Sequence, residues 1–157
     1  INSVLVNGNA IEKNDTAYLV ENVNENLTVS ATFPLIKSGK CGENLTWKYD
    51  SESQTLTISG TGDMYDYQKG ETPWNVLKDK TTISNIVIEN GVTSIGNNAF
   101  NNVKANTIDL AETVNTLGSN CITHYATVFI RGTEIKNIDG AFSDLSNTGH
   151  LLPVARF

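Results

Sequence analysis

The stretch ISNIVIENGVTSIGNNAFNN, residues 83–102, decides the fold because its pattern of apolar residues recurs along the chain. Its apolar positions are Ile86, Ile88, Val92, Ile95, Ala99 and Phe100, and a glycine, Gly96, follows the fourth of them. The pattern returns 22 residues later at Ile108, Leu110, Val114, Leu117, Cys121 and Ile122, again with a glycine, Gly118. A third unit, less evenly spaced, has Val128, Ile130, Ile135, Ile138, Ala141 and Phe142. A repeat of this length predicts a solenoid of stacked coils.

Each unit is too short to bury its own apolar face, so neighbouring units must stack on one another. Residues 86–88 alternate apolar and variable side chains, as in a short strand with one buried face. The Asn90-Gly91 pair predicts a turn, and Gly96 permits a tight bend further on. We therefore expect residues 86–88, 108–110 and 128–130 to lie side by side in one parallel sheet.

The pattern Ile86-x-Ile88, Val92, Ile95-Gly96, Ala99-Phe100 resembles the BspA-like leucine-rich repeats of bacterial surface proteins. The resemblance covers residues 83 to about 147, and it implies a mostly β fold in which residues 83–157 form a short leucine-rich-repeat solenoid. It also implies an exported bacterial protein, extracellular or on the cell surface, with a role in adhesion. The family often has a proline directly after the strand, where this chain has Glu89, Ala111 and Arg131.

Residues 41–82 are expected to cap the solenoid with a β-hairpin and a short helix. The alternation over 45–49 and 56–59, with turn residues between them, predicts the hairpin. Thr72 and Pro73 suit the start of a helix, and Trp74 and Leu77 share one face of it. A solenoid needs such a cap because its first coil has an apolar end that another element must cover. At the other end, residues 150–154 suggest a further strand, with a proline that marks it as an edge.

Residues 1–33 predict a separate small β module. Strand-like patterns at 4–6, 17–20 and 27–33 are separated by turn residues, including the Asn7-Gly8 pair. Their order resembles the trailing part of an internalin-type B-repeat, which is a β-rich spacer of bacterial surface proteins. The resemblance implies missing strands and therefore unpaired edges, through which this module is expected to self-associate. Residues 34–40 are expected to be a linker.

The composition excludes several classes of partner. The chain of 157 residues has 39% hydrophobic and 18% charged residues, which is typical of an ordinary folded protein. Its formal net charge of −6, without a basic patch, argues against nucleic acid and anionic membrane surfaces. No apolar run is long enough to cross a bilayer, so membrane insertion is not expected. The chain opens inside a strand-like pattern, which suggests a piece of a longer exported protein.

No group of residues predicts catalysis, a cofactor or a metal site. Cys41 and Cys121 could form a disulfide, but Cys121 occupies a core position, so a buried free thiol is the favoured interpretation. Cys121 and His124 are three residues apart, yet no third group is spaced to complete a triad. The cysteines and histidines lack the spacing of metal ligands. The chain is therefore interpreted as non-enzymatic.

The predicted sheet has an outward face that suggests a binding surface. If the apolar residues of the strands point inward, Val87, Asp109 and Phe129 form an outward row, and Glu89 and Arg131 lie in the next row. An apolar, an acidic and an aromatic residue in one row suit contact with a protein or extracellular-matrix partner. The alternative is that a neighbouring loop covers Phe129.

Two other functions remain open from the sequence. Tyr65 and Tyr67 are candidates for stacking on sugars, which would make the chain a glycan-binding module. The same aromatic residues suit the core of a small cap, and this interpretation is favoured. The third hypothesis is a structural spacer that displays another domain. The sequence does not identify the ligand, the oligomeric state or the domain order of the intact protein.

Overall fold

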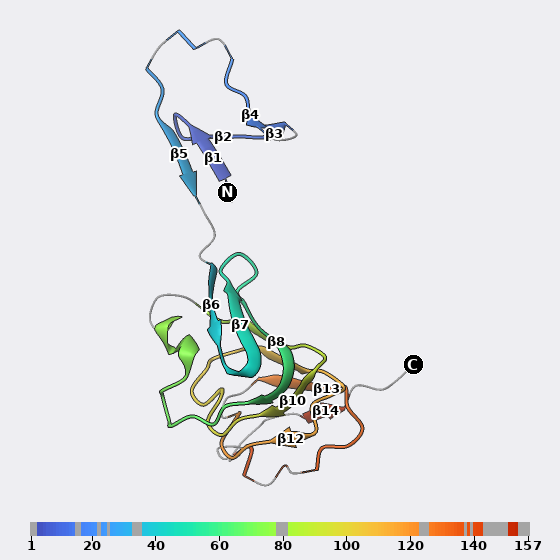
Figure 1. The fold of residues 1–157 in the computed structure, drawn as a ribbon. Coiled ribbons are helices and arrows are strands. Elements are labelled where there is room, and N and C mark those ends of the chain that lie inside the picture. Colours follow the sequence, from blue (N-terminus) through green and yellow to red (C-terminus); the bar gives the residue numbers. More distant parts are fainter. Residues whose placement is uncertain are drawn as a thin grey trace. The chain divides into compact units, whose positions relative to one another are not determined.

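The chain divides into two units, Ile1–Leu35 and Ile36–Phe157, in the computed structural model (Figure 1). The structure describes residues 3–14, 17–21, 23–24, 26–32, 36–77, 82–122, 126–136, 138, 140–142 and 151–153. His124, which the sequence places three residues after Cys121, lies outside the described residues.

The first unit is a small antiparallel sheet with little core. Its strands are β1 (Ser3–Val6), β2 (Asn9–Ile11) and β5 (Val29–Thr32) in the order β2-β1-β5, with a separate pair β3 (Lys13–Asn14) and β4 (Ala17–Tyr18). Asn7 and Gly8 have φ angles of 47° and 82° and form the predicted turn between β1 and β2, since hairpin turns of two residues need positive φ. Exposed apolar side chains include Leu19 at 62% and Val29 at 60%. The likeness to a B-repeat stays a prediction.

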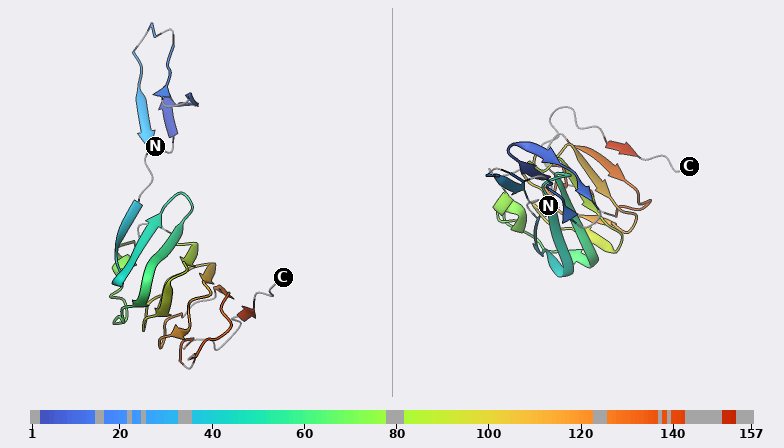
Figure 2. Two further views of the ribbon diagram at one scale, coloured as in Figure 1. Left: turned by 45° about the vertical axis from the view of Figure 1, so that its right-hand side comes forward. Right: turned by 90° about the horizontal axis from the view of Figure 1, so that it is seen from above.

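The second unit contains the predicted parallel ladder, which is confirmed. Strands β9 (Asn85–Ile88), β11 (Thr107–Leu110) and β13 (Thr127–Ile130) are neighbours in register, and β14 (Leu151–Pro153) follows β13 (Figure 2). Ile86 aligns with Ile108, and Ile108 aligns with Val128. These side chains are buried, so each coil adds one layer to a continuous core.

A second, shorter ladder forms another side of the coils. It consists of β10 (Val92–Ile95) and β12 (Thr116–Leu117), which pair in parallel. Val92 and Ile95 are buried, as the sequence predicted, because they point from this side into the same core. In the third unit, Ile138 differs from the expectation, because it is 41% exposed and does not belong to the core.

The predicted hairpin is present, and it forms part of the solenoid. It consists of β7 (Gly42–Asp50) and β8 (Thr55–Met64). Leu56 and Ile58 of β8 align with Ile86 and Ile88 of β9, and the far end of β8 pairs with β10. The cap therefore supplies a first coil of the same geometry, and both ladders share β8.

The expected linker over 34–40 requires correction, because residues Ile36–Lys40 form strand β6. β6 pairs antiparallel with β7 over five positions and lies at the edge of the sheet. Gly39 makes this pairing sterically possible: a Cβ there would lie 2.8 Å from Nε1 of Trp47. The absence of a side chain at Gly39 leaves room for the indole ring of Trp47 beneath β6. This glycine therefore has a packing role.

The expected short helix is the 3₁₀ helix η1 (Pro73–Leu77), which begins at the predicted proline. Its Trp74 and Leu77 are 2% and 1% exposed. Trp74 stacks on Phe100 with 5.2 Å between ring centroids and meets Tyr67 edge-on at 5.6 Å. The indole Nε1 donates to the carbonyl oxygen of Ala99 at 3.1 Å. This one side chain joins the cap to the first repeat.

Candidate binding surface

The outward face of the sheet carries the predicted row of side chains. Thr57, Val87, Asp109 and Phe129, here called the outer row, are in register on β8, β9, β11 and β13. Each lies between two inward-pointing residues of its strand and is partly exposed. The sequence predicted three of the four. Thr57 was missed because it lies in the cap hairpin, whose second strand was not recognised as a coil of the solenoid.

The apolar members of the outer row are on the outside of the molecule. Phe129 and Val87 are partly buried, but neither belongs to the core cluster or to the hydrophobic residues that pack against it. Residues in register with them on adjacent strands lie about 5 Å away on the same face, close enough for their side chains to pack together. An aromatic ring held by its neighbours on an open sheet has few rotamers to lose on binding, which suits an anchor residue.

An ion pair orders the charged part of this surface. Arg131 donates from Nε and Nη2 to the two carboxylate oxygens of Asp109, at 2.6 and 2.5 Å. Hydrogen bonding to Asp109 and the charge of Asp109 raise the pKa of Arg131. The side chains are 51% and 27% exposed, so solvent screens the pair and it contributes little to stability. Its effect is to present a guanidinium and a carboxylate in one orientation beside Phe129.

Glu89 lies apart from this pair. The amide groups of Glu89, Ala111 and Arg131 each donate to the preceding coil, to Ile58, Ile88 and Leu110 respectively, so the three residues occupy equivalent positions. Glu89 is exposed, as expected, but Ala111 between it and Arg131 is only 6% exposed. The structure thus brings together Asp109, Phe129 and Arg131, and it leaves Glu89 two strands away.

Polar side chains flank the outer row. On the preceding row, Thr107 donates from Oγ1 to Oδ1 of Asn85 at 2.8 Å. Towards the cap, Lys48 on β7 aligns with Thr57 and is exposed, which extends the outer row onto the hairpin. Buried and exposed residues alternate along most of 42–50. This alternation would have placed Lys48 on the outward face if the hairpin had been assigned to the same sheet as the repeats.

The two tyrosines proposed for glycan binding have different environments. Tyr67 is partly buried and packs against the core, and its hydroxyl group donates to the carbonyl oxygen of Cys41 at 3.1 Å. Tyr65 is 44% exposed, with its hydroxyl group 3.3 Å from Oε2 of Glu43. Tyr67 is therefore a residue of the cap core, and Tyr65 is the exposed one of the two.

Both cysteines are buried free thiols. Each is 0% exposed, and burial raises the pKa of Cys41 and of Cys121 to about 12. The thiolate is the nucleophilic form of cysteine, so neither side chain has the environment of a reactive residue at neutral pH. Among the described residues, no three His, Cys, Asp or Glu side chains are placed to hold a metal ion.

We expect both thiols to resist a thiol-reactive disulfide reagent in the native chain at pH 8 and both to react after unfolding in guanidinium chloride. Because burial raises the folded pKa above the ordinary 9.0, each thiol contributes stability that is complete below pH 9 and is lost as the pH rises towards 12. The loss is at most about 1.4 kcal/mol per pH unit and thiol. Chemical denaturation at pH 8 and pH 10.5 measures this loss in the free energy of unfolding. Rapid labelling of the native chain, or no labelling after unfolding, would contradict the buried free thiols.

Comparisons with known proteins found similarity to a repeat family and to one solved structure among those compared. A family described as "BspA type Leucine rich repeat region (6 copies)" matches residues 73–151. A leucine-rich repeat protein from Eubacterium ventriosum ATCC 27560, known from its crystal structure, is similar with a TM-score of 0.54 and 28% sequence identity. The similarity covers 59% of this chain and 25% of that one. None of the curated proteins compared matches the chain.

Two further findings bear on the class of protein. Leucine-rich repeat domains generally mediate protein–protein interaction, and their fold is typically non-enzymatic. Within the described part of the chain, no helix has both the length and the apolar character needed to span a membrane.

Proposed function

This chain belongs to the BspA-type leucine-rich repeat family, and we propose that it is a secreted or surface-attached adhesion module that binds a protein or matrix partner through its outward sheet face. Proteins of this family are generally surface-associated bacterial proteins, which supports the location. Residues 41–82 serve as the cap of the repeats at 83–157, and residues 1–33 as a spacer related to B-repeats. The module binds its partner without catalysing a reaction.

One observation carries the proposal: the outer row places Phe129 beside the Asp109–Arg131 pair on an open sheet. Strand Thr127–Ile130 directs Phe129 outward, because its neighbours Val128 and Ile130 face the interior. Apolar anchors surrounded by oriented polar groups are typical of the centres of protein interfaces. A spacer would need no such arrangement on its exposed face.

The dimensions of the face indicate what the partner must contact. The part of the face that carries the outer row and Lys48 covers five neighbouring strands, from β7 to β13, which span about 19 Å at a spacing of about 4.8 Å, and four residues of strand extend about 13 Å. The resulting area of about 250 Å² is well below the ~800 Å² that each side of a standard protein interface buries. The outer row is thus the centre of the interface, and the partner also contacts the flanking rows. A central anchor of this kind has a large effect when it is removed.

Replacing Phe129 with serine is expected to weaken partner binding by about 30-fold or more, because the anchor is lost. The free energy of unfolding should change by less than about 1 kcal/mol, since Phe129 does not pack against the core. Surface plasmon resonance against a panel of immobilised matrix proteins measures binding, and thermal denaturation measures stability.

The matched control is Val76→Ser, which removes an apolar side chain that is 51% exposed on η1. It should bind like the unmodified chain. The proposal is wrong if Phe129→Ser binds as well as the control does. A fall of many degrees in the melting temperature of Phe129→Ser would instead place this ring in the core.

A further inference from the structure

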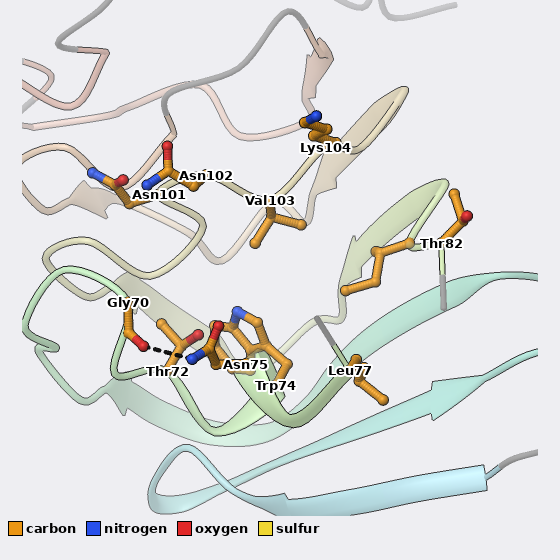
Figure 3. Close-up of a pocket in the computed structure, with 11 residues that line it drawn as sticks. Gly70, Thr72, Trp74, Asn75, Leu77, Thr82, Asn101, Asn102, Val103 and Lys104 are labelled. Atoms are coloured by element: carbon orange, nitrogen blue, oxygen red, sulfur yellow. Dashed lines mark hydrogen bonds between the residues drawn. The ribbon is translucent and has the colours of Figure 1, made fainter. Parts of the chain in front are cut away.

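A cavity of about 360 Å³ lies between the cap and the first repeat, away from the outer row. Figure 3 shows its two walls: one is the segment around η1, with Thr72, Trp74 and Asn75, and the other is the turn after Phe100, with Asn101 and Val103. The volume is at the lower end of the range of about 300–1,000 Å³ that is usual for small-molecule sites. It suits a ligand about the size of one ring.

The walls divide into an apolar and a polar part. The apolar part consists of the partly exposed Ile83 and Val103, with the buried Leu77 and Trp74 beneath them, and all four pack in or against the core. Amide groups flank it from both sides. Asn75 donates one hydrogen from Nδ2 to the carbonyl oxygen of Gly70 at 2.8 Å (Figure 3), and its second hydrogen and its own carbonyl oxygen are left for another partner.

Asn101 provides an independent observation. Its Oδ1 is buried and accepts no hydrogen bond from any described residue. A buried acceptor without a donor is unfavourable, so it needs an explanation. The oxygen is closed to solvent, so it can accept from a ligand in the cavity that Asn101 lines only after rotation about the terminal torsion, which is broad in asparagine. A ligand with hydroxyl groups would supply the missing donor.

The charges around the cavity select the class of ligand. Among the described residues that line it none is acidic, so these residues offer a basic ligand no counter-charge. A purely apolar ligand would bury the amide groups of Asn75 and Asn101 without partners, which is unfavourable. Among the described residues of the lining, Lys104 is the charged one, and it is exposed at the rim and forms no ion pair with a described residue. The ligand that fits these residues is therefore a neutral or acidic molecule with one apolar face and several hydroxyl groups.

We propose that this cavity binds one pyranose unit of a glycan, with the apolar face of the sugar on Ile83 and Val103 and its hydroxyl groups on Asn75 and Asn101. Lys104 pairs with a carboxylate when the sugar is acidic. The cavity does not include the outer row. A negative result for sugar binding would therefore leave the proposed adhesion function unaffected, and the reverse also holds. It is also distinct from the tyrosines considered above, since neither Tyr65 nor Tyr67 lines the cavity.

The test is an NMR titration of the ¹⁵N-labelled full chain with two sets of oligosaccharides, one neutral and one bearing uronic or sialic acid, to ~10 mM because a single ring binds weakly. Saturable shifts at residues of the cavity are expected. Asn101→Ala should weaken binding about tenfold through the lost hydrogen bond, while the melting temperature stays equal or rises, because the variant removes an unsatisfied acceptor.

Two further variants separate the alternatives. Lys104→Gln should weaken only the acidic sugars, and Tyr65→Ala should change neither set. Binding that Tyr65→Ala abolishes and Asn101→Ala leaves intact would overturn the proposal in favour of the exposed tyrosine. Absence of saturable shifts with both sets would overturn it as well. Because Asn101→Ala is expected to fold, a loss of binding in this variant cannot be ascribed to unfolding.

Discussion

Replacing Gly96 with alanine is expected to lower the free energy of unfolding of the second unit by at least about 3 kcal/mol, enough to unfold a marginally stable domain. A Cβ at this position would lie 1.9 Å from the carbonyl oxygen of Tyr65 and 2.6 Å from its carbonyl carbon. Both are backbone atoms of the preceding coil and cannot rotate away. The coils are also tied together here, because Tyr67 donates its amide hydrogen to the carbonyl oxygen of Asn97 at 3.0 Å. Room for a methyl group would require the coils to separate.

The matched control for this prediction is Gly70→Ala. Gly70 has a φ of +82°, but a Cβ there would meet no atom within 4 Å. It should therefore cost only the strain of a left-handed backbone, about 1 kcal/mol. Denaturation in urea, followed by circular dichroism, measures both variants. If Gly96→Ala is no less stable than Gly70→Ala, the close approach of the coils at this position is wrong.

Replacing Trp74 with alanine is expected to cost about 3–5 kcal/mol, as for other large aromatic residues in a core. The variant removes the stack on Phe100 and the edge contacts with Tyr67 and Trp47. It also leaves the carbonyl oxygen of Ala99 without the indole donor, in a region where water cannot easily replace it. Because strand β8 is common to the cap and both ladders, the loss should lower the stability of the whole unit in one transition.

Calorimetry is the suitable measurement, since the substitution removes one of two tryptophans and alters the fluorescence signal. Val76→Ala, on the same short helix and 51% exposed, serves as the control and should change the melting temperature by only a degree or two. Separate melting of the cap and the repeats, or a cost similar to that of the control, would contradict the role of Trp74 as the joint between them.

The glycines show where sequence reasoning found the right residue for an incomplete reason. Gly96 and Gly118 mark each repeat, and the sequence suggested a bend that only glycine allows. Neither has a positive φ angle in the structure. A Cβ at Gly118 would lie 2.5 Å from the backbone nitrogen of Asn97 in the preceding coil. The requirement is the spacing between coils, which a pattern within one coil does not reveal.

The candidate binding surface was largely predictable, because one-dimensional periodicity determines it. Once the 22-residue offset is known, the register of β9 and β11 follows, and Val87 and Asp109 must share a row. The ion pair of Asp109 with Arg131 was not predictable, since it depends on a long side chain reaching back by one coil. The cavity between η1 and the first repeat lacked any signal in the sequence, because its walls come from elements that have different patterns.

By itself the sequence determined the repeat, the parallel strands, the hairpin before them and the outward row, because apolar residues at a regular interval have one way to share a core. Only the tertiary structure decided that β6 extends the sheet, that Tyr67 is internal while Tyr65 is exposed, and that Trp74 joins the cap to the repeats. These features arise from contacts between segments of unrelated pattern. The periodicity of the sequence shows how similar units stack. The packing between dissimilar units depends instead on side-chain shapes that come into contact only in the folded chain.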